Sequence, residues 1–149
     1  MPPMQFRRAK ADDLPAIISL LVDDALGAGR ESRAGDAYAH AFAQIDRDPN
    51  QLLAVAELDG QVIGTLQLTF LQGLSRGGAI RGQIEAVRIA SHLRGQGIGQ
   101  QMIEWAVATC RSRGCTMVQL TTDKSRGDAH RFYDRLGFEQ SHLGYKMAL

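Results

Sequence analysis

The glycine-rich turn from Gly95 to Gly99 constrains this chain more than any other stretch, because three glycines alternate there with other residues. The run before it, IEAVRIA, suits a strand, and the run after it repeats apolar residues at helical spacing. The first N–H groups of a helix have no partner inside the helix, and the helix dipole makes that end positive. Glycines let the backbone approach an anion closely, and Arg94 adds positive charge. The pattern predicts a strand, an anion-binding turn and a helix, although a plain turn could carry the same glycines.

Two familiar phosphate-binding motifs do not fit this turn. The nucleotide P-loop pattern, Gly-x-x-x-x-Gly-Lys-Ser/Thr, does not occur in the sequence. The dinucleotide pattern, Gly-x-Gly-x-x-Gly, does not match the spacing of Gly95, Gly97 and Gly99. The anion is therefore expected to belong to another class of ligand.

The strand before the turn shows a slip in its alternation. Ile84 is apolar, and so are Val87 and Ile89, but the first has the opposite parity from the other two. A strand of period two cannot place all three on one face without an extra residue. A bulge near Glu85 and Ala86 would restore the phase, and a strand buried on both faces is the alternative.

The other elements follow from hydrophobic periodicity and turn residues. Strands are expected at 4–9, in a hairpin over 51–70 with Asp59-Gly60 at its turn, over about 79–90, at 116–122 and, singly or as a pair, at 138–149. Helices are expected after an Asp12 cap until Gly27 and Gly29, from about Asp36 to Arg47, from the glycine turn to Gly114, and from Ala129 to Leu136. This order predicts one mixed α/β sheet with helices on both faces, in a single domain over 1–149.

Composition narrows the class of protein. A chain of 149 residues with a net charge of +1 can bury one core and has no basic excess for nucleic acid. No apolar run is long enough to span a bilayer, and the N-terminal residues lack a signal peptide's apolar region, so we expect a cytoplasmic protein with no membrane partner. Cys110, Cys115 and the 4 histidines lack metal-site spacing, so no metal is expected and both thiols are expected to be reduced packing groups.

Two motifs together resemble the GNAT family of N-acetyltransferases. LRGQGIGQQMI is similar to the family's pyrophosphate signature, Arg/Gln-x-x-Gly-x-Gly/Ala, at Arg94, Gly97 and Gly99. DAHRFYDRLGF is similar to its later motif, Ala-x-x-Phe-Tyr-x-x-x-Gly-Phe, at Ala129, Phe132, Tyr133, Gly137 and Phe138. One helix and one strand separate the two motifs, and the resemblance covers essentially the whole chain. It implies a mostly antiparallel sheet with a splayed parallel strand pair and helices on both faces.

The resemblance implies that acetyl-CoA is the cosubstrate. The strand before the glycine turn would offer backbone groups to the pantetheine arm, at Val87, Arg88 and Ile89. The pyrophosphate would be held by Arg94, Gly95, Gln96, Gly97, Ile98, Gly99 and Gln100. One position departs from the family pattern: many relatives have a CoA-contacting asparagine three residues before the motif alanine, where this chain has Arg126.

The resemblance also implies catalytic roles. Tyr133 matches the family's general acid for the departing thiolate, with core packing as the alternative. Glu85 is the candidate general base, acting through water, with a structural or solvated glutamate as the alternative. A strand N–H near Val87 would stabilise the oxyanion. Asp24 and Glu31 lie where relatives form the acceptor pocket and could hold a cationic amine, although a solvated helix end explains them as well.

These residues lead to a functional hypothesis. The chain is expected to transfer an acetyl group from acetyl-CoA to a primary amine of a small molecule, by direct attack in a ternary complex. Within the family it resembles the aminoalkylphosphonate N-acetyltransferases at RDPN, IEAV, DAHRFY and FEQSH. These four stretches are weak evidence for the identity of the acceptor. Acetylation of proteins or peptides and a non-catalytic CoA-binding sensor remain alternatives, and a homodimer is expected by analogy alone.

Overall fold

The computed structural model describes residues 4–23, 35–122, 125 and 127–149. These residues form two compact units, Met1–Gln119 and Leu120–Leu149. The first unit holds the sheet and most of the helices, and the second holds one helix and the C-terminal segment. The single domain expected over 1–149 stays a prediction.

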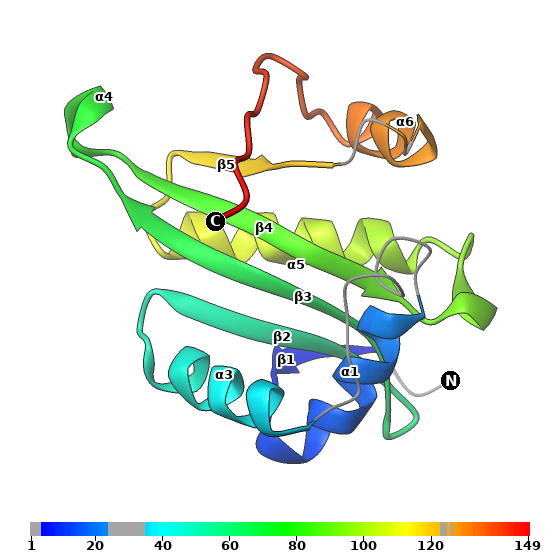
Figure 1. The fold of residues 1–149 in the computed structure, drawn as a ribbon. Helices are drawn as coiled ribbons and strands as arrows, with labels where there is room; N and C mark the ends of the chain where they lie inside the picture. The colour runs from blue at the N-terminus through cyan, green and yellow to red at the C-terminus, as the bar shows by residue number, and fades with distance from the viewer. Residues whose placement is uncertain (1–3, 24–34, 123–124, 126) are drawn as a thin grey trace. The chain divides into compact units, whose positions relative to one another are not determined.

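The sheet has five strands in the order β1-β2-β3-β4-β5. Their bounds are Gln5–Arg8 for β1, Gln51–Leu58 for β2, Gln61–Gln72 for β3, Ile80–Ile89 for β4 and Met117–Leu120 for β5. The first four strands pair in antiparallel fashion, and β5 runs parallel to β4. Asp59 and Gly60 close the β2–β3 hairpin with φ angles of 52° and 77°, as their sequence predicts. The mixed sheet expected from the sequence is confirmed (Figure 1).

Helices cover both faces of the sheet. In the first unit they are η1 (Ala11–Asp13), α1 (Leu14–Val22), α3 (Gly35–Arg47), α4 (Ser75–Gly78), η2 (Ser91–Leu93) and α5 (Ile98–Ser112). Ile17 of α1 and Phe42 of α3 pack with Val55, which points to one face. Because side chains alternate along a strand, Leu66 and Ile84 point to the opposite face, where α5 packs. Figure 1 shows α1 in front of the sheet and α5 behind it.

The close packing of α5 on β4 depends on a missing side chain. A Cβ at Gly82 would lie 2.3 Å from Sγ of Cys110, so no larger residue fits there without movement. Burial raises the pKa of the Cys110 thiol to about 11, and Cys110 and Cys115 are both free thiols, as expected. The helix ends at Ser112, and Gly114 follows it with a φ of 82°, typical of a helix stop, which confirms the predicted stop.

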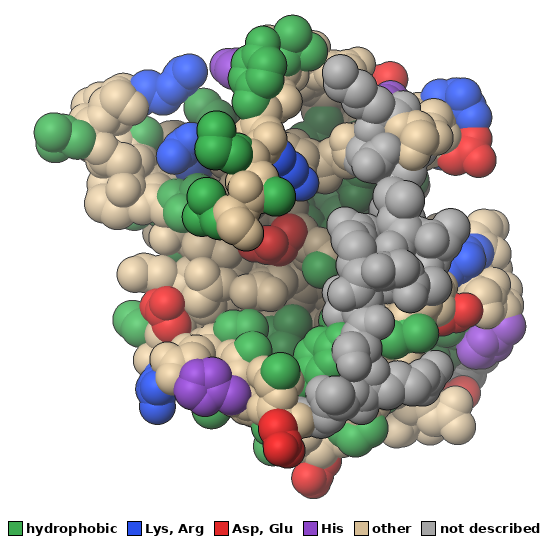
Figure 2. All heavy atoms as spheres, viewed as in Figure 1, with side chains coloured by type: hydrophobic (Ala, Val, Ile, Leu, Met, Phe, Trp, Pro, Cys, Tyr) green, Lys and Arg blue, Asp and Glu red, His purple; other side chains and the backbone are tan. Residues whose placement is uncertain are grey.

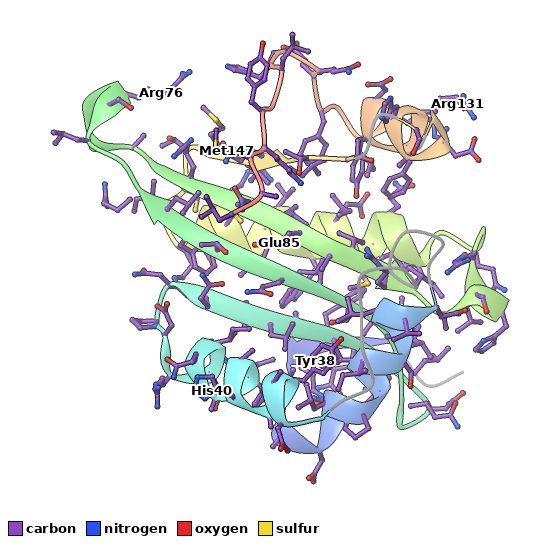
Figure 3. The ribbon with its side chains drawn as sticks, in the orientation of Figure 1. Tyr38, His40, Arg76, Glu85, Arg131 and Met147 are labelled. Atoms are coloured by element: carbon purple, nitrogen blue, oxygen red, sulfur yellow. The ribbon has the colours of Figure 1, made fainter. Side chains whose placement is uncertain are left out.

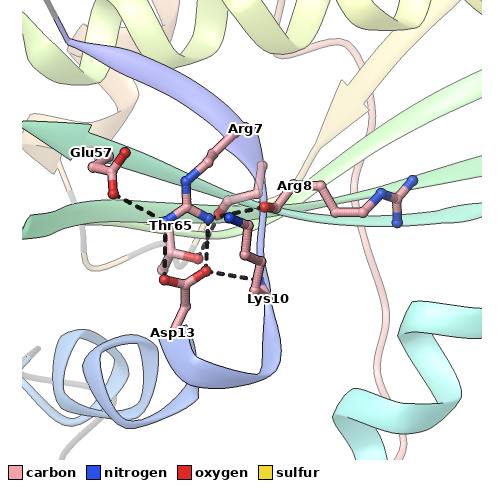
Figure 4. Close-up of polar contacts among 7 residues, drawn as sticks. Arg7, Arg8, Lys10, Asp13, Glu57 and Thr65 are labelled. Carbon is pink, nitrogen blue, oxygen red and sulfur yellow. Dashed lines mark hydrogen bonds and ion pairs between the residues drawn. The ribbon is translucent and has the colours of Figure 1, made fainter. Parts of the chain in front are cut away.

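A partly buried ionic cluster fastens the start of the chain to the sheet (Figure 4). Arg7 donates to both carboxylate oxygens of Asp13, at 2.8 and 3.1 Å, and to Oε1 of Glu57 at 3.2 Å. The backbone N–H of Lys10 donates to Asp13 Oδ2 at 2.7 Å. The hydrogen bonds from Arg7 hold the pKa of Asp13 below its ordinary value. The cluster therefore connects β1, the 3-10 turn and β2.

Two expectations about the ends of elements are wrong. Asp12 was expected to cap the first helix, but it lies inside the 3-10 turn, and Asp13 directly precedes α1 with its carboxylate turned back to Arg7 and Lys10. Residues 138–149 were expected to form a strand or strand pair, but within the described second unit they form none. A strand needs a partner for its backbone groups, and this segment has the alternation of a strand without pairing to one. Its apolar residues are exposed at Leu143, Tyr145, Met147 and Leu149.

The second unit holds one helix, α6 (Gly127–Arg135), close to the predicted bounds. Gly137 follows it with a φ of 93°, as a helix stop requires. In the first helix of the chain, the predicted break at Gly27 and Gly29 lies outside the described residues.

The surface carries both signs of charge. On the face drawn in Figure 2, acidic, basic and hydrophobic side chains of the described residues are interspersed, in keeping with the net charge of +1. Across the described ranges, no helix has both the length and the apolar content needed to cross a membrane.

Candidate active site

The predicted bulge interrupts β4 shortly before the glycine turn. The pairing register with β3 shifts by one residue between Thr65 and Gln67, so two residues of β4, Ala86 and Val87, oppose a single residue. Ala86 has a φ of 53°, which a residue with a side chain rarely adopts. The bulge therefore lies at the position that the slipped alternation indicated beside Glu85. Bulges leave a residue out of the ladder and redirect the side chains around it.

Glu85 lies directly before the bulge, with an exposed side chain midway along the sheet (Figure 3). Its Oε1 accepts a hydrogen bond from Oγ1 of Thr69 at 3.4 Å. Across the bulge, Arg88 donates from NH1 to its neighbour's carbonyl, Val87 O, at 2.9 Å. A carboxylate at this position is accessible to solvent and held by a neutral hydroxyl, so it could accept a proton from a bound molecule.

The glycine turn leads into α5 with an open anion-binding end. Gly97 precedes the helix with a φ of 82°, and the first helical bond runs from Gln101 N to Gly97 O at 3.2 Å. The N–H groups of Ile98, Gly99 and Gln100 therefore have no acceptor inside the helix. A Cβ built on Gly97 would meet nothing within 4 Å, so the space beside the turn is open. These features fit a pyrophosphate group.

The side chains around the turn have separate tasks. Ile98 is buried and anchors the first turn of α5 in the core. Arg94 is exposed, and its NH2 donates to Asp23 O at the end of α1 at 3.1 Å. Gln100 donates to Oε1 of Glu104 at 2.9 Å along the helix surface. Arg94 thus connects the turn to α1 through one of its donors, and its predicted role at the pyrophosphate stays a prediction. The two remaining residues of the predicted cradle, Gly95 and Gln96, are exposed.

Tyr133 lies in the second unit, on α6. Its ring makes edge contacts with Phe132 at 5.0 Å and with Phe138 at 5.8 Å between ring centroids. The packing role that was the alternative to acid catalysis is therefore present. The position of Tyr133 is defined within its own unit, so its role as acid stays a prediction.

Some predicted positions lie outside the described residues. These are the acceptor-pocket candidates Asp24 and Glu31, and Arg126, which replaces the family's asparagine. Among the residues that the structure describes, no three His, Cys, Asp or Glu side chains gather as a metal site.

The sequence reasoning missed a set of polar side chains on the sheet. They share one face, and they are Gln51 on β2, Gln67 and Thr69 on β3, Gln83 and Glu85 on β4, and Gln119 on β5. We call this set the polar band. Its signal was the run TLQLTF, in which polar and apolar residues alternate. The other strands of the band lie far away in the sequence, so only the register brings the members together.

Comparison with known proteins identifies the family. The sequence model of the acetyltransferase (GNAT) family matches residues 14–138. The chain belongs to this family and is an acetyltransferase of the GNAT type. The match runs from α1 through the glycine turn to Phe138, so it includes both motifs.

Individual relatives extend over nearly the whole chain. The aminoalkylphosphonate N-acetyltransferase of Salmonella typhimurium is 32% identical over 100% of this chain and 94% of its own length. A crystal structure of a transcriptional regulator from Bacillus halodurans is 43% identical, with a TM-score of 0.95, and covers 99% of this chain and 100% of that one. A predicted acetyltransferase of Clostridium acetobutylicum, solved with acetyl-CoA, has the same fold at 18% identity and a TM-score of 0.78, over 98% and 96% of the two chains.

Proposed function

We propose that this chain transfers the acetyl group of acetyl-CoA to a primary amine of a small molecule, by direct attack in a ternary complex. The observation that carries the proposal is the bulge at Ala86 and Val87, which lies on the strand that leads into the open glycine turn. A bulge frees strand backbone groups for a ligand, and the turn supplies donors for a phosphate.

Acetyl-CoA would be held mainly by the backbone. The pantetheine arm would lie along β4 at Val87, Arg88 and Ile89, and the pyrophosphate at the start of α5. The open space at the Cβ position of Gly97 supports this assignment, because phosphate oxygens need close access to the N–H groups. The N–H groups are oriented by the helix, so little order has to be created when the anion binds.

The chain's residues would then serve the transfer itself. The amine must be neutral when its nitrogen attacks the thioester carbonyl, and Glu85, directly or through water, would accept the ammonium proton. A strand N–H near Val87 would stabilise the oxyanion that forms. The C–S bond then breaks, and Tyr133 would give its phenolic proton to the CoA thiolate. The second proton that the attacking nitrogen must lose would pass through solvent to the Tyr133 phenolate. The products are an acetamide and free CoA.

The acceptor is proposed to be a small molecule. The relative from Salmonella typhimurium, which matches the full chain, is named as an aminoalkylphosphonate N-acetyltransferase. That name supports a small amine over a protein N-terminus. Asp24 and Glu31 remain candidates for holding the cationic amine, and a homodimer remains a proposal that light scattering tests directly.

The experiment that tests the proposal is a screen of amines, amino acids, aminophosphonates and peptides with acetyl-CoA, read by release of free thiol. Turnover of at least one small amine is the expected result. The name of the Bacillus halodurans structure favours a second candidate, a CoA-binding sensor that does not catalyse. Binding of acetyl-CoA by calorimetry without turnover of any amine would decide for the sensor, and preferred turnover of peptides would decide for protein acetylation.

A further inference from the structure

The polar band connects into two hydrogen-bonded groups. In the first, Gln51 Oε1 accepts from Gln67 Nε2 at 2.9 Å and from Thr69 Oγ1 at 3.0 Å, and Thr69 also reaches Glu85. In the second, Gln119 Nε2 donates to Gln83 Oε1 at 3.1 Å. The amides are thus held in fixed orientations by one another, before any ligand arrives.

Arg81 lies at one end of the band, two residues before Gln83 on the same face of β4. Its NH1 donates to Gln119 Oε1 at 3.3 Å. A guanidinium has five N–H donors, so this bond leaves several for a ligand. The band therefore runs from a carboxylate at Glu85, across neutral amides, to a cation at Arg81.

This arrangement differs from an ordinary solvated sheet face. Antiparallel sheets often turn one polar face to water, and such faces usually carry exposed, mixed charges. Here the amides and Arg81 are half-buried, and the end charges have opposite sign. On the same face, Leu53 and Val55 of β2 pack with Ile17 of α1, so the helices cover that part of the face. Polar groups in fixed positions can orient a bound small molecule.

We infer that the polar band is the acceptor-binding surface and that Arg81 binds an anionic group at the far end of the acceptor from its amine. The inference rests on the proposed function, since it places the amine at Glu85. Glu85 is four residue steps along the strand from Arg81, or about 13 Å at roughly 3.3 Å per residue. Both side chains lean toward the middle of the band, because Glu85 contacts Thr69 and Arg81 contacts Gln119. The amine and the anion of an acceptor that contacts both groups would thus be less than about 13 Å apart.

This separation defines a substrate class. The acceptor would be a primary amine with a hydrogen-bonding spacer, such as a sugar ring or an amide, that ends in a phosphate, phosphonate or carboxylate. Amide side chains of the band would pair with hydroxyl or amide groups of the spacer. A two-carbon aminophosphonate has its amine and anion close together, so we expect it to be a weaker acceptor than a longer anionic amine.

The test compares matched acceptors and matched variants. Glucosamine 6-phosphate and glucosamine differ only in the anion, and aminoalkylphosphonates of two to six carbons, with plain alkylamines as partners, vary the length. Each is assayed for kcat/KM with wild type, Arg81→Gln and Arg81→Lys. The control is Arg76→Gln on α4, which removes an exposed positive charge outside the band (Figure 3). Melting temperature and acetyl-CoA affinity are measured for each variant, to separate misfolding from loss of recognition.

The expected result is a preference for the phosphorylated or longer anionic amine of roughly 10- to 100-fold, the effect of one charge-assisted pair. Arg81→Gln should abolish that preference by raising KM, Arg81→Lys should restore part of it, and Arg76→Gln should keep it. Equal use of charged and neutral amines, or a preference that survives in Arg81→Gln, would overturn the inference. If no amine is acetylated, binding of glucosamine 6-phosphate is measured by calorimetry. Binding that depends on Arg81 would support the acceptor-binding surface and refute the proposed acetyl transfer, and no binding would refute both.

Discussion

Replacing Gly97 by valine separates the binding role of the glycine turn from its role in the fold. Gly97 has a φ of 82°, and a Cβ there would meet nothing within 4 Å, so the cost to stability comes from the backbone conformation and not from a clash. A β-branched residue in this region costs about 1–3 kcal/mol, or roughly 2–12 °C in melting temperature for a chain of this size. The valine methyl groups would occupy the space that phosphate oxygens need. Losing two charge-assisted hydrogen bonds would lower acetyl-CoA affinity by about 100-fold or more.

The chain offers a matched control at Gly60. It has a φ of 77° in the β2–β3 turn, and a Cβ there also meets nothing within 4 Å. Gly60→Val should therefore lose about the same stability as Gly97→Val and keep its affinity for acetyl-CoA. The assay is a thermal melt of both variants, followed by calorimetric titration with acetyl-CoA below the transition. Affinity in Gly97→Val within about threefold of the control would mean that the turn holds no pyrophosphate.

Three further substitutions test other steps. Tyr133→Phe should lower kcat by roughly 10²–10⁴-fold with little change in acetyl-CoA affinity, since the ring still packs; an unchanged kcat in steady-state assays would remove the acid role. Glu85→Gln should lower kcat to a similar extent with the melting temperature unchanged, and full activity in the variant would return Glu85 to a structural role. Asp13→Asn should destabilise the protein by about 1.5–3 kcal/mol at pH 7, because Arg7 loses a charged partner, whereas Asp12→Asn should not. The pKa of Asp13 is lowered in the folded protein, so its contribution to stability is present above the unfolded pKa of about 4 and is lost as the pH falls through the folded pKa. Urea melts of wild type and Asp13→Asn should therefore show a smaller difference in unfolding free energy at pH 3 than at pH 7. The same difference at both pH values would contradict the ion-pair account.

Local signals were enough for the elements that position the site. The hairpin was predicted by Asp59-Gly60, whose positive φ angles few other residue pairs supply. The bulge was predicted because Ile84 and Val87 differ in parity, and the register of β4 confirms it. The end of α5 was predicted by Gly114, which adopts the left-handed conformation of a helix stop. In each case a single residue type is tied to one backbone geometry.

What the sequence did not reveal depends on partners that are far away along the chain. Nothing near Asp13 shows that Arg7 will pair with both Asp13 and the distant Glu57, so the neighbouring Asp12 was an equally good cap. The polar band was missed for the same reason, since Gln51 and Gln119 come together only through the order of the strands. The C-terminal segment shows the reverse error, because its alternation is that of a strand but alternation alone does not supply a partner.

The bulge in β4 also explains how one strand can serve the core and the site together. Glu85 and Arg88 are three apart in sequence, so in a regular strand they would point to opposite faces. The extra residue, Ala86, places both on the face of the polar band, where they pair with consecutive odd-numbered positions of β3. The same shift places Ile89 beside Gly64, with its Cδ1 3.0 Å from where a Cβ would be, on the face covered by α5. A strand without the extra residue would turn the charged group of Arg88 into the apolar layer under α5 and expose Ile89, because a slip of one residue reverses every later side chain. The packing of α5 therefore requires the same irregularity that the proposed acetyl-CoA site uses, which gives the chain a structural reason to keep a left-handed alanine in the middle of a strand.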